Sequence, residues 1–133
     1  MTPCFADTSF YVALLSPRDS LHMRAIGLVG TRPARTVTTE FVLIETANFF
    51  TAPKLRPLFA ALVTTIRNDP GAVVVPSTSE WYSRGLKLFL NRSDKEWSLT
   101  DCISFAVMTE FGLIDALTAD HHFVQAGLAA LLV

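Results

Sequence analysis

The chain has 133 residues, a length typical of one compact domain, and half of them are apolar, which is enough to form a buried core of ordinary size. The formal net charge of −1 does not mark a nucleic-acid binder, and two cysteines are too few for a disulfide framework. No apolar run approaches the roughly 18 residues that span a bilayer, and the N-terminus lacks a signal-peptide pattern, so we expect a cytoplasmic protein with no membrane partner.

Short apolar runs alternate along the chain with longer amphipathic stretches. The short runs are mostly unbroken, which is typical of strands buried on both faces of a parallel sheet. The longer stretches have helical periodicity, and serine side chains at 20, 77 and 98 are candidate helix caps. In chain order we predict strands at residues 3–6, 36–38, 72–76, 116–118 and 128–133, and helices at residues 10–15, 20–30, 39–51, 54–68, 77–90, 98–111 and 120–125.

This order of elements predicts one α/β domain over residues 1–133, built on a mainly parallel sheet of four or five strands. Helices are expected on both faces, because unbroken apolar strands need cover on both sides. Right-handed crossovers place the carboxyl ends of parallel strands along one edge, where open sheets bind ligands. Polar residues that follow the strands are therefore the candidates for a functional site.

Three aspartates fall at this predicted edge. Asp7 directly follows the first strand, and Asp120 comes two residues after Thr118, where the fourth strand is predicted to end. Asp101 lies in the first turn of a helix that begins at the same edge. We therefore expect the three carboxylates to lie close together.

The helix after the second strand supplies a fourth carboxylate. Glu45 lies among apolar residues, and Glu40 is five residues earlier, about 140° away around a helix. At most one of the two is expected to face the site, and the helix geometry does not decide between them. Asn48 lies three residues after Glu45 on the same face and is a candidate to line the pocket with it.

Each carboxylate also has a local structural role open to it. Asp7 and Asp120 could cap the helices that follow them, and Glu45 could pair with a distant arginine. Asp101 has the spacing of a capping box with Ser98, as Glu80 has with Ser77 in the preceding helix. Read singly, none of the four requires a catalytic explanation.

The four carboxylates together point to a metal site. Gathered at one edge they would repel one another and raise their pKa values, which a protein tolerates mainly when a cation lies among them. Oxygen-only ligands suit Mg²⁺ or Mn²⁺ rather than Zn²⁺. A metal held by carboxylates activates water and stabilises charge at phosphorus, so phosphodiester hydrolysis is the reaction these residues suit best.

Four segments of the sequence resemble the signature segments of PIN-domain ribonucleases, and most of all VapC-type toxins of bacterial toxin–antitoxin pairs. The resemblance covers essentially the whole chain, and the four segments occur in the family's order. They are FADTSF (residues 5–10), VLIETANFF (42–50), SLTDCISFAVM (98–108) and LTADHHFVQAG (117–127).

The resemblance implies a three-layer α/β/α sandwich and an endoribonuclease that depends on Mg²⁺, with Mn²⁺ as a second possible cofactor. It also implies a homodimer that is neutralised by a cognate antitoxin protein, in a heterotetramer or a larger assembly. It favours Glu45 over Glu40 and assigns Ser9 and Thr100 as hydroxyls that orient carboxylates or waters. The acidic site that it implies, as catalytic and metal-binding residues, is Asp7, Glu45, Asp101 and Asp120.

Two other functions compete with this hypothesis. A haloacid-dehalogenase-like phosphatase would need a second aspartate two residues after the first, where this chain has Ser9. A non-catalytic PIN-like RNA-binding module would keep the fold without the activity. A Cys102 nucleophile lacks the rest of a triad.

Four ring side chains are further candidates for RNA contact. Trp81 and Trp97 could stack on bases, although aromatic residues near helices are more often core residues. His121 and His122, beside Asp120, could contact phosphate or simply begin a helix.

Overall fold

A computed structural model describes residues 2–31 and 35–133 and contains a parallel sheet between two groups of helices. The helices have at most 13 residues, and none among the described residues is long and apolar enough to cross a membrane. The strands are β1 (Cys4–Ala6), β2 (Thr36–Thr39), β3 (Ala72–Val75), β4 (Asp115–Leu117) and β5 (Ala129–Ala130). The helices are α1 (Thr8–Leu15), α2 (His22–Gly30), α3 (Glu40–Ala47), α4 (Arg56–Asn68), α5 (Ser79–Asn91), α6 (Leu99–Phe111) and α7 (His121–Gln125).

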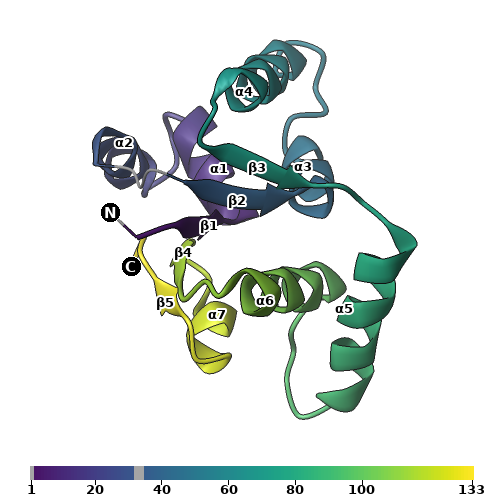
Figure 1. Ribbon diagram of the computed structural model, residues 1–133. Helices are drawn as coiled ribbons and strands as arrows, with labels where there is room; N and C mark the ends of the chain where they lie inside the picture. Colours follow the sequence, from purple (N-terminus) through teal and green to yellow (C-terminus); the bar gives the residue numbers. More distant parts are fainter. Residues whose placement is uncertain (1, 32–34) are drawn as a thin grey trace.

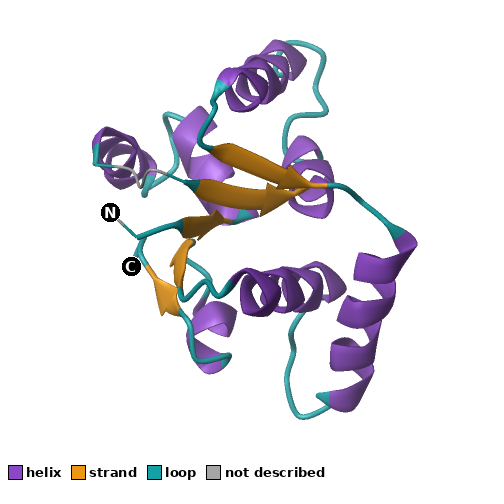
Figure 2. Ribbon diagram, in the orientation of Figure 1, coloured by secondary structure: helices purple, strands orange, loops and turns teal. Residues whose placement is uncertain are grey.

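The sheet has the strand order β3-β2-β1-β4-β5, and its four pairings are parallel (Figure 2). From β1 the chain passes through β2 to β3, and it then returns across the sheet to β4 and β5. Right-handed crossovers place α1 to α4 on one face and α5 to α7 on the other (Figure 1). This confirms the predicted α/β fold and makes the boundary between β1 and β4 the point where open sheets bind ligands.

The core lies around β1 and α6. Phe5 and Val37, on β1 and β2, are fully buried, and α6 is apolar on most of its surface because the sheet and α5 both cover it. Helix α5 approaches α6 at the buried Gly85, where a Cβ atom would collide with Ile103. This close packing holds the start of α6, and with it Asp101, against the sheet.

The edge strand β3 differs from the prediction of a fully buried strand. Its three valines suggest burial on both faces, yet only Val75 is buried and the rest of the strand is half-buried. The reason is its place at the end of the strand order, where one side of the strand has no neighbour. Apolar composition alone does not separate an edge strand from a central one.

Helix boundaries were predicted less well where side chains have distant partners. Ser77 does not cap α5, because its N–H and hydroxyl donate to the Glu40 carboxylate at 2.7 and 3.1 Å, and Thr78 caps the helix instead. Ser20 does not cap α2, since Asp19 accepts the N–H of Leu21 just before that helix begins. Helix α3 ends at Ala47, and β5 has only two residues, both shorter than predicted.

Candidate active site

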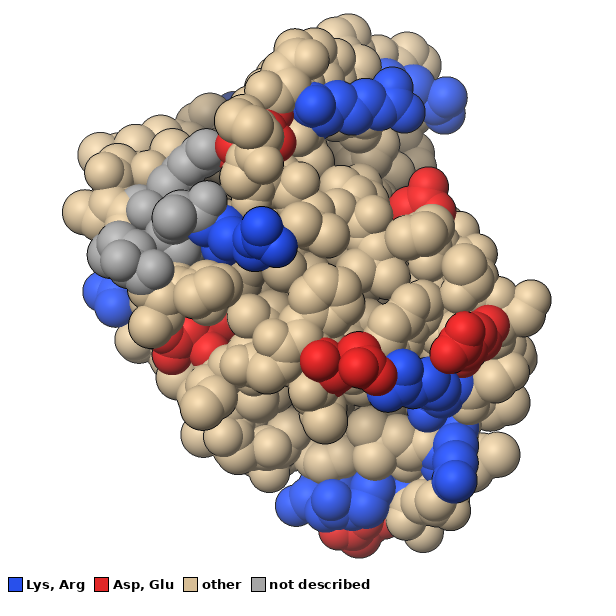
Figure 3. All heavy atoms as spheres, viewed as in Figure 1, with Lys and Arg blue, Asp and Glu red and all other residues tan. Residues whose placement is uncertain are grey.

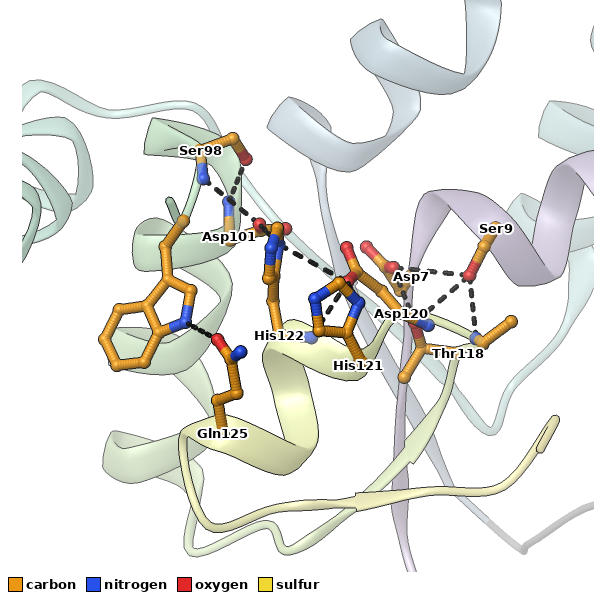
Figure 4. Close-up of polar contacts among 11 residues, drawn as sticks. Asp7, Ser9, Ser98, Asp101, Thr118, Asp120, His121, His122 and Gln125 are labelled. Carbon is orange, nitrogen blue, oxygen red and sulfur yellow. Dashed lines mark hydrogen bonds and ion pairs between the residues drawn. The ribbon is translucent and has the colours of Figure 1, made fainter. Parts of the chain in front are cut away.

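One pocket, of about 290 Å³, brings the four predicted carboxylates together beyond the carboxyl ends of β1 and β4. They come from four places in the fold: the end of β1, the middle of α3, the first turn of α6 and the start of α7. Figure 4 shows three of them with their polar contacts. The predicted carboxylates that line the pocket are Asp7, Glu45, Asp101 and Asp120, and a fifth, Asp19, lines it as well.

Asp7 is the most deeply placed carboxylate of the pocket. It precedes α1, but its side chain makes no capping hydrogen bond, and only 4% of the residue is exposed. Its Oδ2 accepts a hydrogen bond from the Thr118 hydroxyl at 2.8 Å and a longer one from Ser9 at 3.5 Å. The pKa of Asp7 is raised to about 7. Burial is the main cause, the nearby charges of Asp101 and Glu45 add to it, and the hydrogen bond from Thr118 opposes it.

Thr118 connects two of the carboxylates, a role that the sequence analysis did not assign. Its buried hydroxyl donates to Asp7, accepts the N–H of Asp120 at 3.0 Å and lies 3.1 Å from the Ser9 hydroxyl. Ser9 in turn accepts the N–H of Ala119 at 3.0 Å. Both hydroxyls therefore join β1 to the segment after β4, and the position of Thr118 at the end of a predicted strand was the available signal.

Asp101 both caps its helix and lines the pocket. Its N–H donates to the Ser98 hydroxyl at 3.0 Å, and its carboxylate accepts the Ser98 N–H at 3.1 Å, so the predicted capping box is confirmed. The same Oδ2 lies 3.2 Å from Nδ1 of His122. Burial raises the pKa of Asp101, and the charge of Asp120 adds to this, while the hydrogen bond from Ser98 opposes it.

Asp120 and Glu45 complete the acidic lining. The Asp120 carboxylate accepts the N–H of His122 at 2.9 Å and so caps α7. Glu45 is half-buried on α3 and lines the pocket, whereas Glu40 is exposed and bonded to Ser77. The structure therefore places Glu45, not Glu40, with the three aspartates.

Two predicted supporting residues do not line the pocket, and several residues that were not predicted do line it. Asn48 is exposed and lines a neighbouring hollow. Thr100 does not line the acidic pocket, because it is turned about 100° from Asp101 around α6. The unpredicted residues include Asp19, whose carboxylate accepts the N–H of Leu21, and Phe49, which is 59% exposed. The others are Thr8, Val12 and Leu21.

Three residues that were candidates for catalysis or RNA contact, Trp81, Trp97 and Cys102, do not line the acidic pocket. Trp97 is 5% exposed and donates its indole N–H to Gln125, so it is a core residue and has no free face for a base. Trp81 is half-buried, with the Arg84 guanidinium 4.4 Å above its ring. Burial raises the pKa of the Cys102 thiol to about 11, which keeps it protonated and argues against a thiolate nucleophile.

The lining of the pocket fits a hard divalent cation. Five carboxylates line one space, and two of them, Asp7 and Asp101, are buried and have raised pKa values, so these two are costly to ionise in the absence of a positive partner. Oxygen donors of this kind are the usual ligands of Mg²⁺ and Mn²⁺. The chemistry of the donor set therefore suits such an ion.

The chain belongs to the PIN domain family, whose model matches residues 4–128. Membership of this family removes the support for a haloacid-dehalogenase-like phosphatase.

Within the family, the chain is homologous to VapC toxins. It is 29% identical over 123 residues to the 23S rRNA-specific endonuclease VapC20 from two strains of Mycobacterium tuberculosis, which covers 92% of this chain and 93% of that protein. It also matches the crystal structure of M. tuberculosis VapC20, described as a sarcin-ricin loop cleaving toxin. That match has a TM-score of 0.85 at 27% identity and covers 96% of this chain and 97% of the other.

Proposed function

We propose that this protein is a metal-dependent endoribonuclease that hydrolyses RNA phosphodiester bonds and acts as the toxin of a toxin–antitoxin pair. The observation that carries the proposal is the gathering of four carboxylates in one pocket at the β1–β4 boundary. The similarity to VapC20, which is named as an endonuclease of 23S rRNA, supports RNA as the substrate class. The sarcin-ricin loop is therefore the first substrate to test.

In this proposal Asp7, Glu45, Asp101 and Asp120 hold Mg²⁺ or Mn²⁺. When bound, the metal supplies positive charge for the phosphate and makes water a better nucleophile. The protein's own contribution is to hold the carboxylates in place. Hydroxyl groups from the segment after β4 and from α1 hold Asp7, and the capping box holds Asp101.

The attacking water also needs an acceptor for its hydrogen bond. We assign this role to Glu45, because the three aspartates already accept hydrogen bonds from protein donors. Glu45 is half-buried, so it contacts both the pocket and solvent. Its carboxylate would orient the water and accept its proton.

We propose that Phe49 binds an RNA base beside the scissile phosphate. Its ring is 59% exposed and lines the acidic pocket, and bases stack on exposed aromatic rings with little sequence preference. The distribution of charge does not indicate a path for RNA on the face shown in Figure 3. Lys and Arg form separate groups there, with acidic side chains between them.

The change Phe49→Ala should raise KM for RNA roughly tenfold and leave kcat nearly unchanged, since stacking contributes about 1–3 kcal/mol per base. Phe49→Trp keeps a stacking surface and is the matched control. Steady-state cleavage of an RNA oligonucleotide measures both constants. An unchanged KM in Phe49→Ala would remove the stacking role.

We also propose that the protein forms a homodimer in the cytoplasm and binds a cognate antitoxin protein, as a heterotetramer or a larger assembly. Large exposed apolar side chains such as Ile44 and Leu90, 58% and 66% exposed, support a protein partner. Light scattering on the purified protein measures the assembly of this chain alone. Loss of RNA cleavage on addition of the product of an adjacent small gene tests for the antitoxin.

The test of the proposed function is cleavage of RNA by the purified protein. We expect Mg²⁺ or Mn²⁺ to support cleavage of RNA that contains the sarcin-ricin loop, and we expect EDTA to stop it. Failure to cleave this loop or total cellular RNA with either metal, while RNA still binds, would favour a non-catalytic RNA-binding module. Circular dichroism of the same sample shows whether the protein is folded.

A further inference from the structure

Two adjacent histidines lie beside two carboxylates of the pocket, Asp101 and Asp120. His121 and His122 open α7 directly after Asp120, and their ring centroids are 4.4 Å apart. The side chain of His122 is 20% exposed and that of His121 is 75% exposed. Figure 4 shows the two rings close to Asp101 and Asp120.

The separations between nitrogen and oxygen atoms are those of ligands around one ion. Nδ1 of His122 lies 3.2 Å from Oδ2 of Asp101 and 3.3 Å from Oδ1 of Asp120. Nδ1 of His121 lies 3.7 Å from the same Asp120 oxygen, and one donor atom each from Asp120, His121 and His122 fall within 4.8 Å of one another. Two ligands of one ion with bonds of about 2.0–2.2 Å lie about 3.0–3.5 Å apart.

The core holds this arrangement in place. Phe123, the residue after His122, is fully buried, with its ring 4.9 Å from that of Phe105 and 6.4 Å from that of Phe5. The hydrogen bond from the N–H of His122 to Asp120 fixes the first turn of α7. The nitrogen and oxygen donors are therefore positioned before any ion arrives, which lowers the cost of binding.

We propose that Asp120, His121 and His122, with Asp101 beside them as a further ligand, form a mixed nitrogen–oxygen site for a transition-metal ion such as Mn²⁺, Co²⁺ or Zn²⁺. The inference rests on the proposed metal-dependent function and adds imidazole ligands to a pocket for which the sequence predicted oxygen ligands alone. Imidazole binds these ions well, and Mg²⁺ prefers oxygen. The histidines should therefore decide which metal the pocket selects.

The experiment measures metal binding to the full chain without RNA and without a polyhistidine tag. Titration calorimetry with CoCl₂ and MgCl₂ compares the wild type with His122→Phe and with His121→Ala, the second of which changes an exposed residue. We expect His122→Phe to weaken Co²⁺ binding at least tenfold and to change Mg²⁺ binding less than threefold. His22→Gln, on α2, is the matched control, because the His22 ring lies 2.7 Å from the carbonyl oxygen of Ala13 rather than beside Asp101 and Asp120, and it should change neither.

Spectroscopy on the wild type gives an independent readout. Electron spin-echo modulation of bound Mn²⁺ should show nitrogen coupling that weakens in His122→Phe and disappears when His121→Ala is added to it, and Co²⁺ should show visible absorption typical of nitrogen ligation. Absence of nitrogen coupling in the wild type, or unchanged Co²⁺ binding in a folded His122→Phe, overturns the inference and leaves His122 as a hydrogen-bond partner of Asp101. Failure of the wild type to bind Mg²⁺, Mn²⁺ and Co²⁺ would instead overturn the metal-dependent function itself.

Discussion

Asp7 and Asp101 occupy similar places for different reasons. Each is a buried aspartate near the start of a helix, and each lines the same pocket. Asp101 closes a capping box with Ser98, in which its carboxylate accepts the Ser98 N–H and the Ser98 hydroxyl accepts the Asp101 N–H. Asp7 makes no cap for α1, and its carboxylate bonds instead to the Thr118 hydroxyl, from a segment 111 residues away in the sequence.

The difference separates structural from functional burial of a charge. The cap that Asp101 forms offsets part of the free-energy cost of burying its charge. Asp7 loses hydration without forming a cap for its helix. Its pKa of about 7 reflects that loss. A carboxylate that lowers stability where a neutral side chain would fit is best explained by a function, here the binding of a cation.

The largest expected effect is on activity, where the two aspartates should behave alike. Asp7→Asn and Asp101→Asn each remove a charged metal ligand, so we expect each to lower the rate of RNA cleavage by at least about a hundredfold. Initial rates on one RNA substrate at saturating Mg²⁺ measure the effect. A variant of either kind that keeps activity within threefold of the wild type would show that its carboxylate is only structural.

A smaller effect is expected when the hydroxyl that holds Asp7 is removed. Thr118→Val keeps the shape of the buried side chain but loses the hydrogen bond to Asp7, and we expect cleavage to fall about 10- to 100-fold. Thr118→Ser keeps the hydroxyl and should stay close to the wild type. Equal rates for the valine and serine variants would mean that Thr118 does not position Asp7.

The two aspartates should differ in the size of their effect on stability. Without metal at pH 8, Asp7→Asn should raise the free energy of unfolding by roughly 2 kcal/mol, because it removes a buried charge. Asp101→Asn should change it by less than about 1 kcal/mol, because burial also raises the pKa of Asp101 but the loss of a charged capping group offsets that gain. Urea unfolding measures both, and an effect of Asp101→Asn as large as that of Asp7→Asn would contradict the comparison.

The stabilising effect of Asp7→Asn should depend on pH. The pKa of Asp7 is raised from 3.8 to about 7 in the folded state, so the folded protein binds this proton more tightly than the unfolded chain does. The contribution of Asp7 to stability is therefore present below pH 4 and is lost as pH rises from about 4 to 7. The difference between wild type and Asp7→Asn should grow over that range and stay constant above it.

Local signals in the sequence predicted the fold and most of the pocket. Unbroken apolar runs identified the parallel strands, and the capping box of Ser98 and Asp101 followed from a spacing of three residues. Glu45 was separated from Glu40 only by resemblance to a family, because helix geometry does not say which face meets the sheet.

The missed features depend on contacts that distant segments make. Thr118 contacts Asp7 only after the sheet forms. Ser77 was predicted to cap α5, but it donates to Glu40, which is 37 residues away in the sequence. Asn48 was misplaced because a residue three positions after Glu45 is still about 60° from it around a helix, and this turn places Asn48 in the neighbouring hollow. Periodicity and capping rules contain no information about such partners, which decide the details of the pocket.

The central claim is that the acidic pocket binds a divalent cation through Asp7 and its neighbours. Titration calorimetry of MnCl₂ into the metal-free wild type and into Asp7→Asn at pH 8 tests it most directly. We predict binding to the wild type and at least tenfold weaker binding to the variant, which urea unfolding should show to be folded. Equal Mn²⁺ affinity for the two proteins would contradict the claim.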